Sequence, residues 1–546
     1  MASKRAAALL IAVAVGAVAL WPLARLLGEA LRDGTGGVAA ALTTPAALRA
    51  AWHTAVVAMA SAALSTVLGG GFAILAGVTD LPGRRVLGFL FTLLLLIPSQ
   101  VTAVAWIELL GAASPVLGPL GLAPAGGMRN PLYGPGGLIG LLGVENAPLV
   151  FLVLRAGLRQ VDGALLEAAQ ASGSGAAEVI WRVVLPLGRP ALVAGATLAA
   201  VSAAGNFGTA ALLGIPGRYP VLTTLIYQRL SGFGPGALGG VAALSLPLVG
   251  LALVGFGAER ALVGQGATDG ERQLALLPLR RPRICAAACW VALAGLLGLP
   301  MVALAGTALV QAYGQPLAAG ATLANFAEVL ARHPATGRAL ANSFVLAGTS
   351  AAALAAAAVL GCWLALRWRG LAAVLAVAEL GYVLPGTVLA VGCILAYSRP
   401  VLGVLLYDTL GIILIAYLGR FWALVRRPVA AALRGLDPAL EEAAQMAGAA
   451  PWRRFQTVVA PQVLPAAAAG GLLVFLTAFN ELTVSALLWS AGHETIGVEV
   501  FSFEQAGEVP LAAALSCVSV AMTVALMGGS ALLGRRLPAG ALPWQG

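Results

Sequence analysis

The sequence predicts an all-α polytopic membrane protein with about twelve transmembrane helices, arranged as two six-helix repeats. Hydrophobic residues make up 60% of its 546 residues and charged residues only 10%, whereas roughly a quarter of the residues are charged in a typical soluble domain. The mean hydropathy is +0.93. A segment of about thirty residues also occurs twice, 275 positions apart, each time between long apolar segments.

The long apolar segments predict the transmembrane spans. A helix that crosses about 30 Å of hydrocarbon at about 1.5 Å per residue needs roughly 20 apolar residues. The expected spans are residues 6–24, 53–77, 87–110, 136–157, 190–214, 236–258, 285–311, 340–366, 371–396, 404–425, 463–489 and 509–533. The first is expected to be an uncleaved span, because it is longer than a usual signal sequence and Trp21 and Pro22 follow it without a small-residue cleavage site.

Arginine and lysine in the short loops predict the orientation, because such loops tend to stay in the cytoplasm. They place both termini and both copies of the repeated segment on the cytoplasmic side. The net charge of +10 then reflects topology, and we expect the lipid bilayer and no nucleic acid as a partner.

An arginine-rich linker divides the chain into two halves of the same orientation. We expect a first transmembrane domain at 1–260, a cytoplasmic linker at 261–284 and a second transmembrane domain at 285–546. Six spans return the chain to its starting side, so the halves are parallel repeats about a pseudo-two-fold axis along the membrane normal. Pro98 and Pro385 lie in the third apolar element of each half and predict a kinked or broken helix there.

The repeated segment, residues 158–190 and 433–465, predicts a helix-turn-helix on the cytoplasmic surface. Each copy has a run of good helix formers, a glycine (Gly173 or Gly448), a second short helical stretch and a proline. Glycine permits the positive φ that ends a helix and turns the chain. The small alanines beside it allow close approach of another protein.

These residues resemble the EAA loop of inner-membrane permeases of ABC transporters. The matching residues are Glu167, Ala168, Ala169, Gly173, Leu185 and Pro186 in the first copy, and Glu442, Ala443, Ala444, Gly448 and Pro461 in the second. The second copy departs from the pattern at Ala460, where a leucine would precede the proline.

The resemblance implies a type I ABC importer permease fold in the bacterial inner membrane. The two loops would then dock on two copies of a cytoplasmic ATPase, and a periplasmic or extracellular substrate-binding protein would deliver the cargo. The only lysine of the chain is Lys4, so the chain has no Walker A loop, whose lysine reaches the phosphates of ATP. We therefore expect a transport subunit that is not itself an enzyme and has no cofactor.

The resemblance also suggests a cargo. Fused double permeases of this size are typical of the iron(III) group, and residues 206–228 and 479–488 are similar to that type. Ferric iron is the expected cargo, with thiamine, 2-aminoethylphosphonate or a polyamine as alternatives. An ion-coupled secondary transporter also uses internal repeats and broken helices, but it does not need the duplicated loop. An intramembrane enzyme would need a converging catalytic constellation, which the sequence does not show.

Four polar residues in the spans are candidates for a transport pathway: Asn206, Asn480, Glu481 and Glu379. Asn206 and Glu481 are equivalent under the 275-residue offset. Each follows a proline by sixteen residues, about 24 Å of helix, which places both towards the outer side. The alternative is hydrogen bonding between helices. We expect no metal site, since the three histidines are scattered along the chain.

Overall fold

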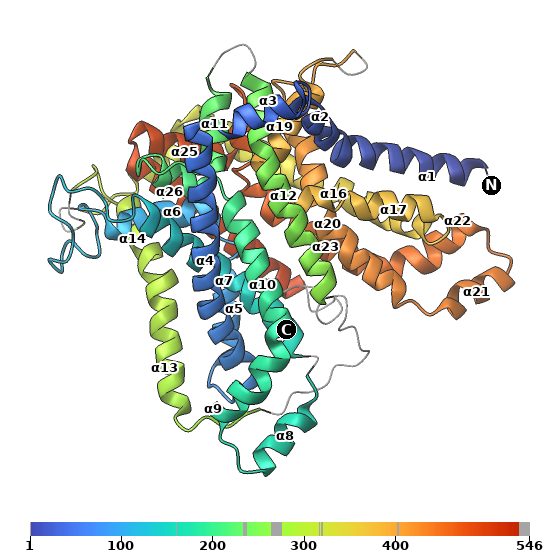
Figure 1. Cartoon of the computed structure of the whole chain (residues 1–546), viewed down its shortest axis with the longest axis horizontal. Coiled ribbons are helices and arrows are strands. Elements are labelled where there is room, and N and C mark those ends of the chain that lie inside the picture. Colours follow the sequence, from blue (N-terminus) through green and yellow to red (C-terminus); the bar gives the residue numbers. More distant parts are fainter. Residues whose placement is uncertain are drawn as a thin grey trace.

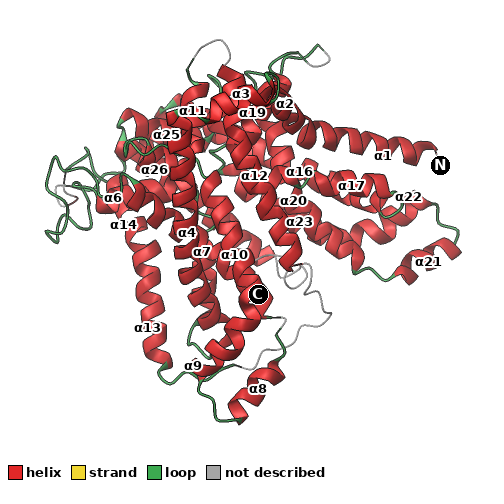
Figure 2. Cartoon of the chain, viewed as in Figure 1, coloured by secondary structure: helices red, strands yellow, loops and turns green. Residues whose placement is uncertain are grey.

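The computed structural model describes residues 2–159, 161–232, 237–263, 276–315, 317, 320–400 and 403–533. In these ranges the regular structure is helical (Figure 2), apart from isolated bridge residues, of which Thr79 and Leu277 pair with each other. Residues 264–275 of the expected linker lie outside the described residues. Around them, α12 continues to Val263 and α13 begins at Pro282.

The helices of the first half, with η marking single-turn π-helical segments, are α1 (Ala2–Val15), η1 (Gly16–Leu20), α2 (Trp21–Ala30), α3 (Gly34–Leu42), α4 (Pro45–Val78), α5 (Arg84–Leu93), α6 (Ser99–Leu110), α7 (Pro135–Leu158), α8 (Gly163–Ala171), α9 (Ala176–Val179), η2 (Ile180–Val184), α10 (Leu185–Gly205), η3 (Ala210–Gly214), α11 (Leu222–Leu230) and α12 (Ala237–Val263). The second half contains α13 (Pro282–Leu293), η4 (Ala294–Gly298), α14 (Leu299–Ala308), α15 (Ala324–Ala327), η6 (Glu328–Arg332), α16 (Pro334–Ala365), α17 (Arg369–Val377), α18 (Leu380–Val383), α19 (Gly386–Tyr397), α20 (Leu410–Arg434), α21 (Pro438–Met446), α22 (Pro451–Arg454), η7 (Phe455–Val459), α23 (Ala460–Phe479), α24 (Ser485–Leu488), α25 (Ile496–Ala506) and α26 (Val509–Leu533).

Nine helices of the described part are long and apolar enough to cross a membrane, or ten if one bent pair counts as a span. The bent pair joins residues 369–383 to residues 386–397 at 116°. Likewise, α5 and α6 are separate helices, and α6 starts directly after Pro98. The expected spans 87–110 and 371–396 were therefore wrong as continuous helices. The helix break predicted at both prolines is confirmed.

Three other expected spans have one end that lies nine or ten residues from the end of the matching helix. The expected tenth span corresponds to α20, which begins at Leu410 and continues to Arg434. It is not among the nine apolar helices because three of its arginines, Arg420, Arg426 and Arg427, make it too charged. The expected spans 190–214 and 463–489 are too long at their outer ends, since the helices stop at Gly205 and Phe479.

The first helices of each half pack against helices of the other half. In the first half, α1 packs on α16 and α17, and α2 packs on α19; in the second half, α13 packs on α5 and α14 packs on α6. Hydrogen bonds reinforce both exchanges. Tyr397 Oη donates to the carbonyl oxygen of Ala17 at 2.6 Å, and Thr307 Oγ1 donates to Glu108 Oε2 at 3.0 Å.

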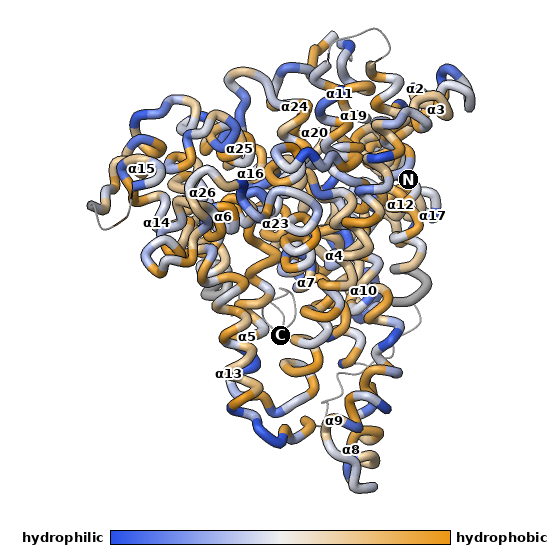
Figure 3. The backbone as a smooth tube through the Cα atoms, turned by 60° about the vertical axis from the view of Figure 1, so that its left-hand side comes forward, coloured by the Kyte–Doolittle hydropathy of each residue, from blue (hydrophilic) through white to orange (hydrophobic). Residues whose placement is uncertain are grey.

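The helices form a shared body from which two legs diverge (Figure 1). One leg contains α4, α5, α7, α10 and α13 and ends at α8 and α9, and the other contains α1, α16, α17, α20 and α23 and ends at α21 and α22. Many of the long helices are hydrophobic along most of their length, and hydrophilic residues gather in the connections (Figure 3). The two repeated segments thus lie at the far ends of the two legs.

The hydroxyl of Thr44 accepts a hydrogen bond from Ala47 N at 3.3 Å, and Pro45 begins α4, so the helix starts with a cap and a preset φ.

Close backbone approach holds the first leg together. Further along α4, a Cβ on Gly69 would lie 2.1 Å from the carbonyl oxygen of Ala147 on α7. Small residues let membrane helices pack at such short range.

Replacing Gly69 by alanine should separate α4 from α7 and destabilise the protein. Overpacking of this kind costs about 1–3 kcal/mol, and a fall in the melting temperature of the detergent-solubilised chain measures it. Gly71→Ala on the same helix is the matched control, because no atom lies within 4 Å of a Cβ there. Equal melting temperatures for the two variants would contradict the close approach.

Candidate coupling loops and transport pathway

The first repeated segment is a helix closed at both ends by local hydrogen bonds. At its start, Asp162 Oδ1 accepts from Ala164 N at 3.1 Å. At the end of α8, Gly173 has φ +88°, its N–H donates to the Gln170 carbonyl at 2.9 Å, and Ser174 N donates to the Ala169 carbonyl at 3.2 Å. This bond pair is a Schellman motif, which needs a residue in the left-handed region.

The second segment repeats this arrangement bond for bond. Asp437 Oδ1 accepts from Ala439 N at 2.9 Å. Gly448 has φ +76°, its N–H donates to the Gln445 carbonyl at 2.9 Å, and Ala449 N donates to the Ala444 carbonyl at 3.0 Å. The prediction of a helix-turn-helix with a glycine of positive φ is confirmed in both copies.

The predicted loop residues form two equivalent exposed surfaces. The exposed members are Glu167, Ala168, Gly173 and Pro186 in the first loop, and Glu442, Ala443, Gly448 and Pro461 in the second. Ala169 and Ala444 are half-buried in both cases. The two prolines lie just after the π-helical turns η2 and η7, inside helical runs that extend from Ala176 to Gly205 and from Pro451 to Phe479.

Different kinds of side chain connect the two loops to the rest of the protein. In the first loop Leu166 and Val179 are buried in an apolar cluster with neighbouring helices. Their counterparts at the 275-residue offset are polar. Arg367 Nη2 lies 2.6 Å from Glu441 Oε1, and the buried Arg454 donates from Nη1 to Gln445 Oε1 at 2.6 Å.

Asn206 and Glu481 explain why α10 and α23 end early. Asn206 Oδ1 accepts from Thr209 N at 3.0 Å, and the carboxylate of Glu481 accepts from Val484 N at 2.9 Å. Each side chain therefore caps the backbone N–H three residues later and starts a new helical turn. The apolar residues that follow belong to η3 and α24 and not to the long helices.

The sequence reasoning missed the side chains that face these two caps. Glu145, on α7, accepts a hydrogen bond at Oε2 from Asn206 Nδ2 at 3.4 Å. Arg420, on α20, has its Nε atom 3.9 Å from Glu481 Oε1. Residues 145 and 420 are themselves 275 positions apart, so the repeat and a charge inside each expected span were the signals that could have identified them.

The other two pathway candidates lie in separate networks. Asn480 Nδ2 donates to Thr523 Oγ1 at 2.9 Å and its Oδ1 accepts from Ser519 Oγ at 2.6 Å, which ties α23 to α26. Glu379 is buried and pairs with Arg426 and Arg427 on α20. The structure thus groups Glu481 with Arg420 and Asn206 with Glu145, and places Glu379 apart from both.

The broken helices bring these groups to the contact between the halves. A Cβ on Gly205 would lie 3.1 Å from Pro385 of the second half. In the opposite direction, Gln100 Nε2 donates to the carbonyl oxygen of Asn480 at 3.1 Å. The two proline breaks therefore each reach across to the helix end of the other half.

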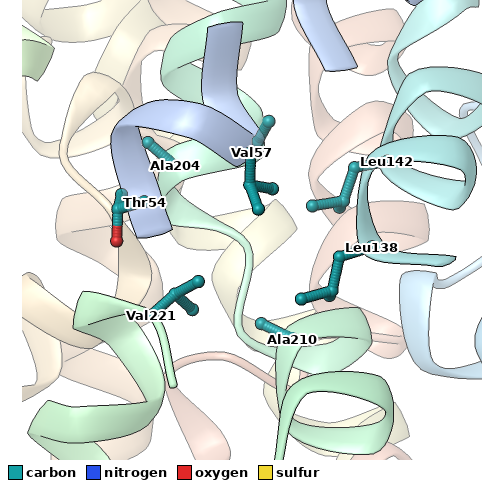
Figure 4. A pocket seen from close by; sticks show the side chains of 8 residues that line it. Thr54, Val57, Leu138, Leu142, Ala204, Ala210 and Val221 are labelled. Atoms are coloured by element: carbon teal, nitrogen blue, oxygen red, sulfur yellow. The ribbon is translucent and has the colours of Figure 1, made fainter. Parts of the chain in front are cut away.

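A small cavity nearby is not a cargo site. It has a volume of about 10 Å³ and lies between α4, α7, α10 and η3 (Figure 4). Its lining includes Val57, Leu138 and Leu142, and its one polar side chain, Thr54, already donates to the Ala50 carbonyl and accepts from Leu222 N. This is room for about one water molecule.

Comparison with known proteins finds the same duplication. The profile of the family described as "Binding-protein-dependent transport system inner membrane component" matches residues 69–263 and again residues 352–537. Each match contains one of the two exposed loops.

Three similar proteins illustrate the range of relatives. The "Probable ABC transporter permease protein y4fN" of Sinorhizobium fredii is 28% identical over 542 residues, covering 95% of this chain and 92% of the relative. The "Fe(3+)-transport system permease protein FbpB 2" of Haemophilus influenzae is 26% identical over 67% of this chain and 70% of its own length. The "Putative 2-aminoethylphosphonate transport system permease protein PhnV" of Salmonella paratyphi A is 28% identical over 44% of this chain and 89% of its own length.

The family profile covers more than half of the chain in two copies, and apolar helices long enough to span a membrane lie in both copies. The chain therefore belongs to the binding-protein-dependent transport system inner membrane components and is a multi-pass permease of an ABC importer.

Proposed function

We propose that the chain is the fused double permease of an ATP-driven importer of ferric iron. Residues 1–260 and 285–546 would be its two transmembrane domains, joined by a cytoplasmic linker at 261–284. The observation that carries the proposal is the pair of loops with one backbone geometry, exposed at the far ends of the two legs. Each loop would dock on one of two identical ATPase subunits, and a binding protein would deliver cargo to the opposite side.

Both termini are assigned to the cytoplasm with the loops. The first helix supports this orientation, because its N-terminal end lies on the same leg as α21 and α22 (Figure 1). Helix-in-groove docking suits a short exposed helix of small residues. The loop residues of the two copies, from Glu167 and Glu442 to Pro186 and Pro461, are thus proposed as the route by which ATP-driven closure reaches the membrane helices.

Ferric iron is preferred to the other cargoes because of the relatives' names and the share of this chain with which each relative aligns. The relative named for Fe(3+) transport aligns with two thirds of this chain, whereas the one named for 2-aminoethylphosphonate aligns with less than half of it. The phosphonate is therefore the second candidate. Thiamine and polyamines remain alternatives from the sequence resemblance.

The double variant Gly173→Val, Gly448→Val should lose the ATPase. Valine is strained at φ values of +88° and +76°, so both loop turns would open. We expect at least a tenfold fall in the ATPase that copurifies with the full chain, while the amount of chain in the membrane stays unchanged.

Asparagine tolerates positive φ better than valine does, so Gly173→Asn, Gly448→Asn is the matched control and should retain most of the association. Normal copurification of the ATPase with the double valine variant would refute the docking assignment.

Ferric iron should stabilise the cognate binding protein. A ligand at 100 times its dissociation constant adds about 2.7 kcal/mol, which corresponds to a rise of roughly 5–10 °C in the melting temperature of a protein of 150–250 residues. Parallel melts with thiamine, 2-aminoethylphosphonate and spermidine are the comparison. Stabilisation by one of these and not by ferric iron would reassign the cargo.

A further inference from the structure

Two charged residues occupy equivalent places in the two halves but differ in sign. Helices α7 and α20 begin at residues 135 and 410, which are 275 positions apart, so Glu145 corresponds to Arg420. The same offset relates Asn206 to Glu481. In each half the two residues face one another, at 3.4 Å in the first half and 3.9 Å in the second.

The second-half pair neutralises itself. The guanidinium of Arg420 balances the carboxylate of Glu481, which also accepts backbone hydrogen bonds from Val484 at 2.9 Å and from Ser485 at 3.2 Å. The Nη1 atom of Arg420 is buried without a hydrogen bond and packs against Gly386. This half of the pathway therefore carries no net charge.

The first-half pair contains no cationic side chain. Glu145 contacts the amide of Asn206 at 3.4 Å and the hydroxyl of Thr209 at 2.8 Å, and both groups are neutral. Among the described residues, no ion pair involves Glu145. A carboxylate in a membrane usually faces a partner or a cavity, and Glu145 has no arginine beside it, whereas Glu481 has Arg420.

The oxygen atoms around Glu145 suit a cation. Thr209 Oγ1 lies 2.8 Å from Glu145 Oε1 and 3.4 Å from the carbonyl oxygen of Ser99. Carboxylate, hydroxyl and carbonyl oxygens are the donors that hard cations prefer. Both supporting residues come from helix breaks, since Ser99 follows Pro98 and Thr209 follows the end of α10.

This oxygen cluster lies where the halves meet. A Cβ on Gly208, beside Thr209, would lie 2.7 Å from Ser99 Oγ and 3.4 Å from Leu482 of the second half. Transporter binding sites are commonly built from broken helices at the contact between repeats. Cargo that passes between the halves would therefore meet Glu145.

We propose that Glu145, with Thr209 and the Ser99 carbonyl, contacts a cationic cargo in transit, and that the Arg420–Glu481 pair is its self-neutralised counterpart. This rests on the proposed importer function. It selects cations, ferric iron first and then thiamine or a polyamine, over the anionic phosphonate.

The test is cargo uptake into proteoliposomes that contain the full chain and its ATPase, with radiolabelled ferric iron loaded on the binding protein. Glu145→Gln keeps the shape and removes the acidic group, and it should lower the initial uptake rate at least tenfold. Glu145→Asp should recover part of that rate. ATP hydrolysis stimulated by the binding protein should stay within about twofold, which a merely structural defect would not allow.

Glu328→Gln is the matched control, because within the described residues the side chain of Glu328 makes only an exposed pair with Arg332 at 3.9 Å. Wild-type ferric uptake by Glu145→Gln would overturn the inference. If the wild-type complex takes up no ferric iron, the cargo proposal fails separately, and uptake of thiamine and spermidine is compared with that of 2-aminoethylphosphonate.

Loss of thiamine or spermidine uptake in Glu145→Gln would then support the cation site. Phosphonate uptake that survives Glu145→Gln and is lost in Arg420→Gln would overturn it. Absence of ATP-driven uptake of all four compounds by the wild type would overturn the importer function and the inference together.

Discussion

A backbone group in hydrocarbon has no water to bind, so a helix can stop inside the membrane only where something else takes its place. Several helices of this protein end in this way, and side chains or the opposite half contact the backbone at the breaks. Asn206 and Glu481 accept the N–H groups of Thr209 and Val484, at the starts of the helical turns that follow α10 and α23. The breaks at Pro98 and Pro385 are packed against the opposite half. Polar side chains such as those of Gln100, Asn206 and Glu481 therefore lie at the breaks, where the halves meet.

Local rules predicted the loops well and the ends of the helices poorly. Gly173 and Gly448 could be placed in a turn because only a residue that tolerates positive φ closes a Schellman motif, and a proline break needs no distant partner. The ends of α10 and α23 could not be predicted, since the apolar run continues past Asn206 and Glu481. The pairing of Glu145 with Asn206 depends on the packing of α7 against α10, which hydropathy does not encode. The coupling and pathway roles of all these residues stay predictions.

The two loops share a backbone and differ in what lies beneath it. An aspartate cap and a glycine suffice to build the turn, so selection on the turn leaves the supporting residues free. The first loop uses the buried side chains of Leu166 and Val179, and the second uses Glu441 and Arg454. The two halves thus keep the same exposed turn, while the contacts beneath it differ.

The exchange of first helices imposes an order on the assembly of the fold. Helix α1 packs on α16 and α17, which the ribosome makes some three hundred residues later. The side chains that α1 buries there, such as Ala8 and Ile11, must therefore face lipid until then. Helix α13 packs on α5, which is already in place when α13 emerges. Contacts between distant segments form slowly because a long loop must close first. Two exchanges that are symmetric in space are therefore completed at different times, and the fold can be finished only when the second half has been made.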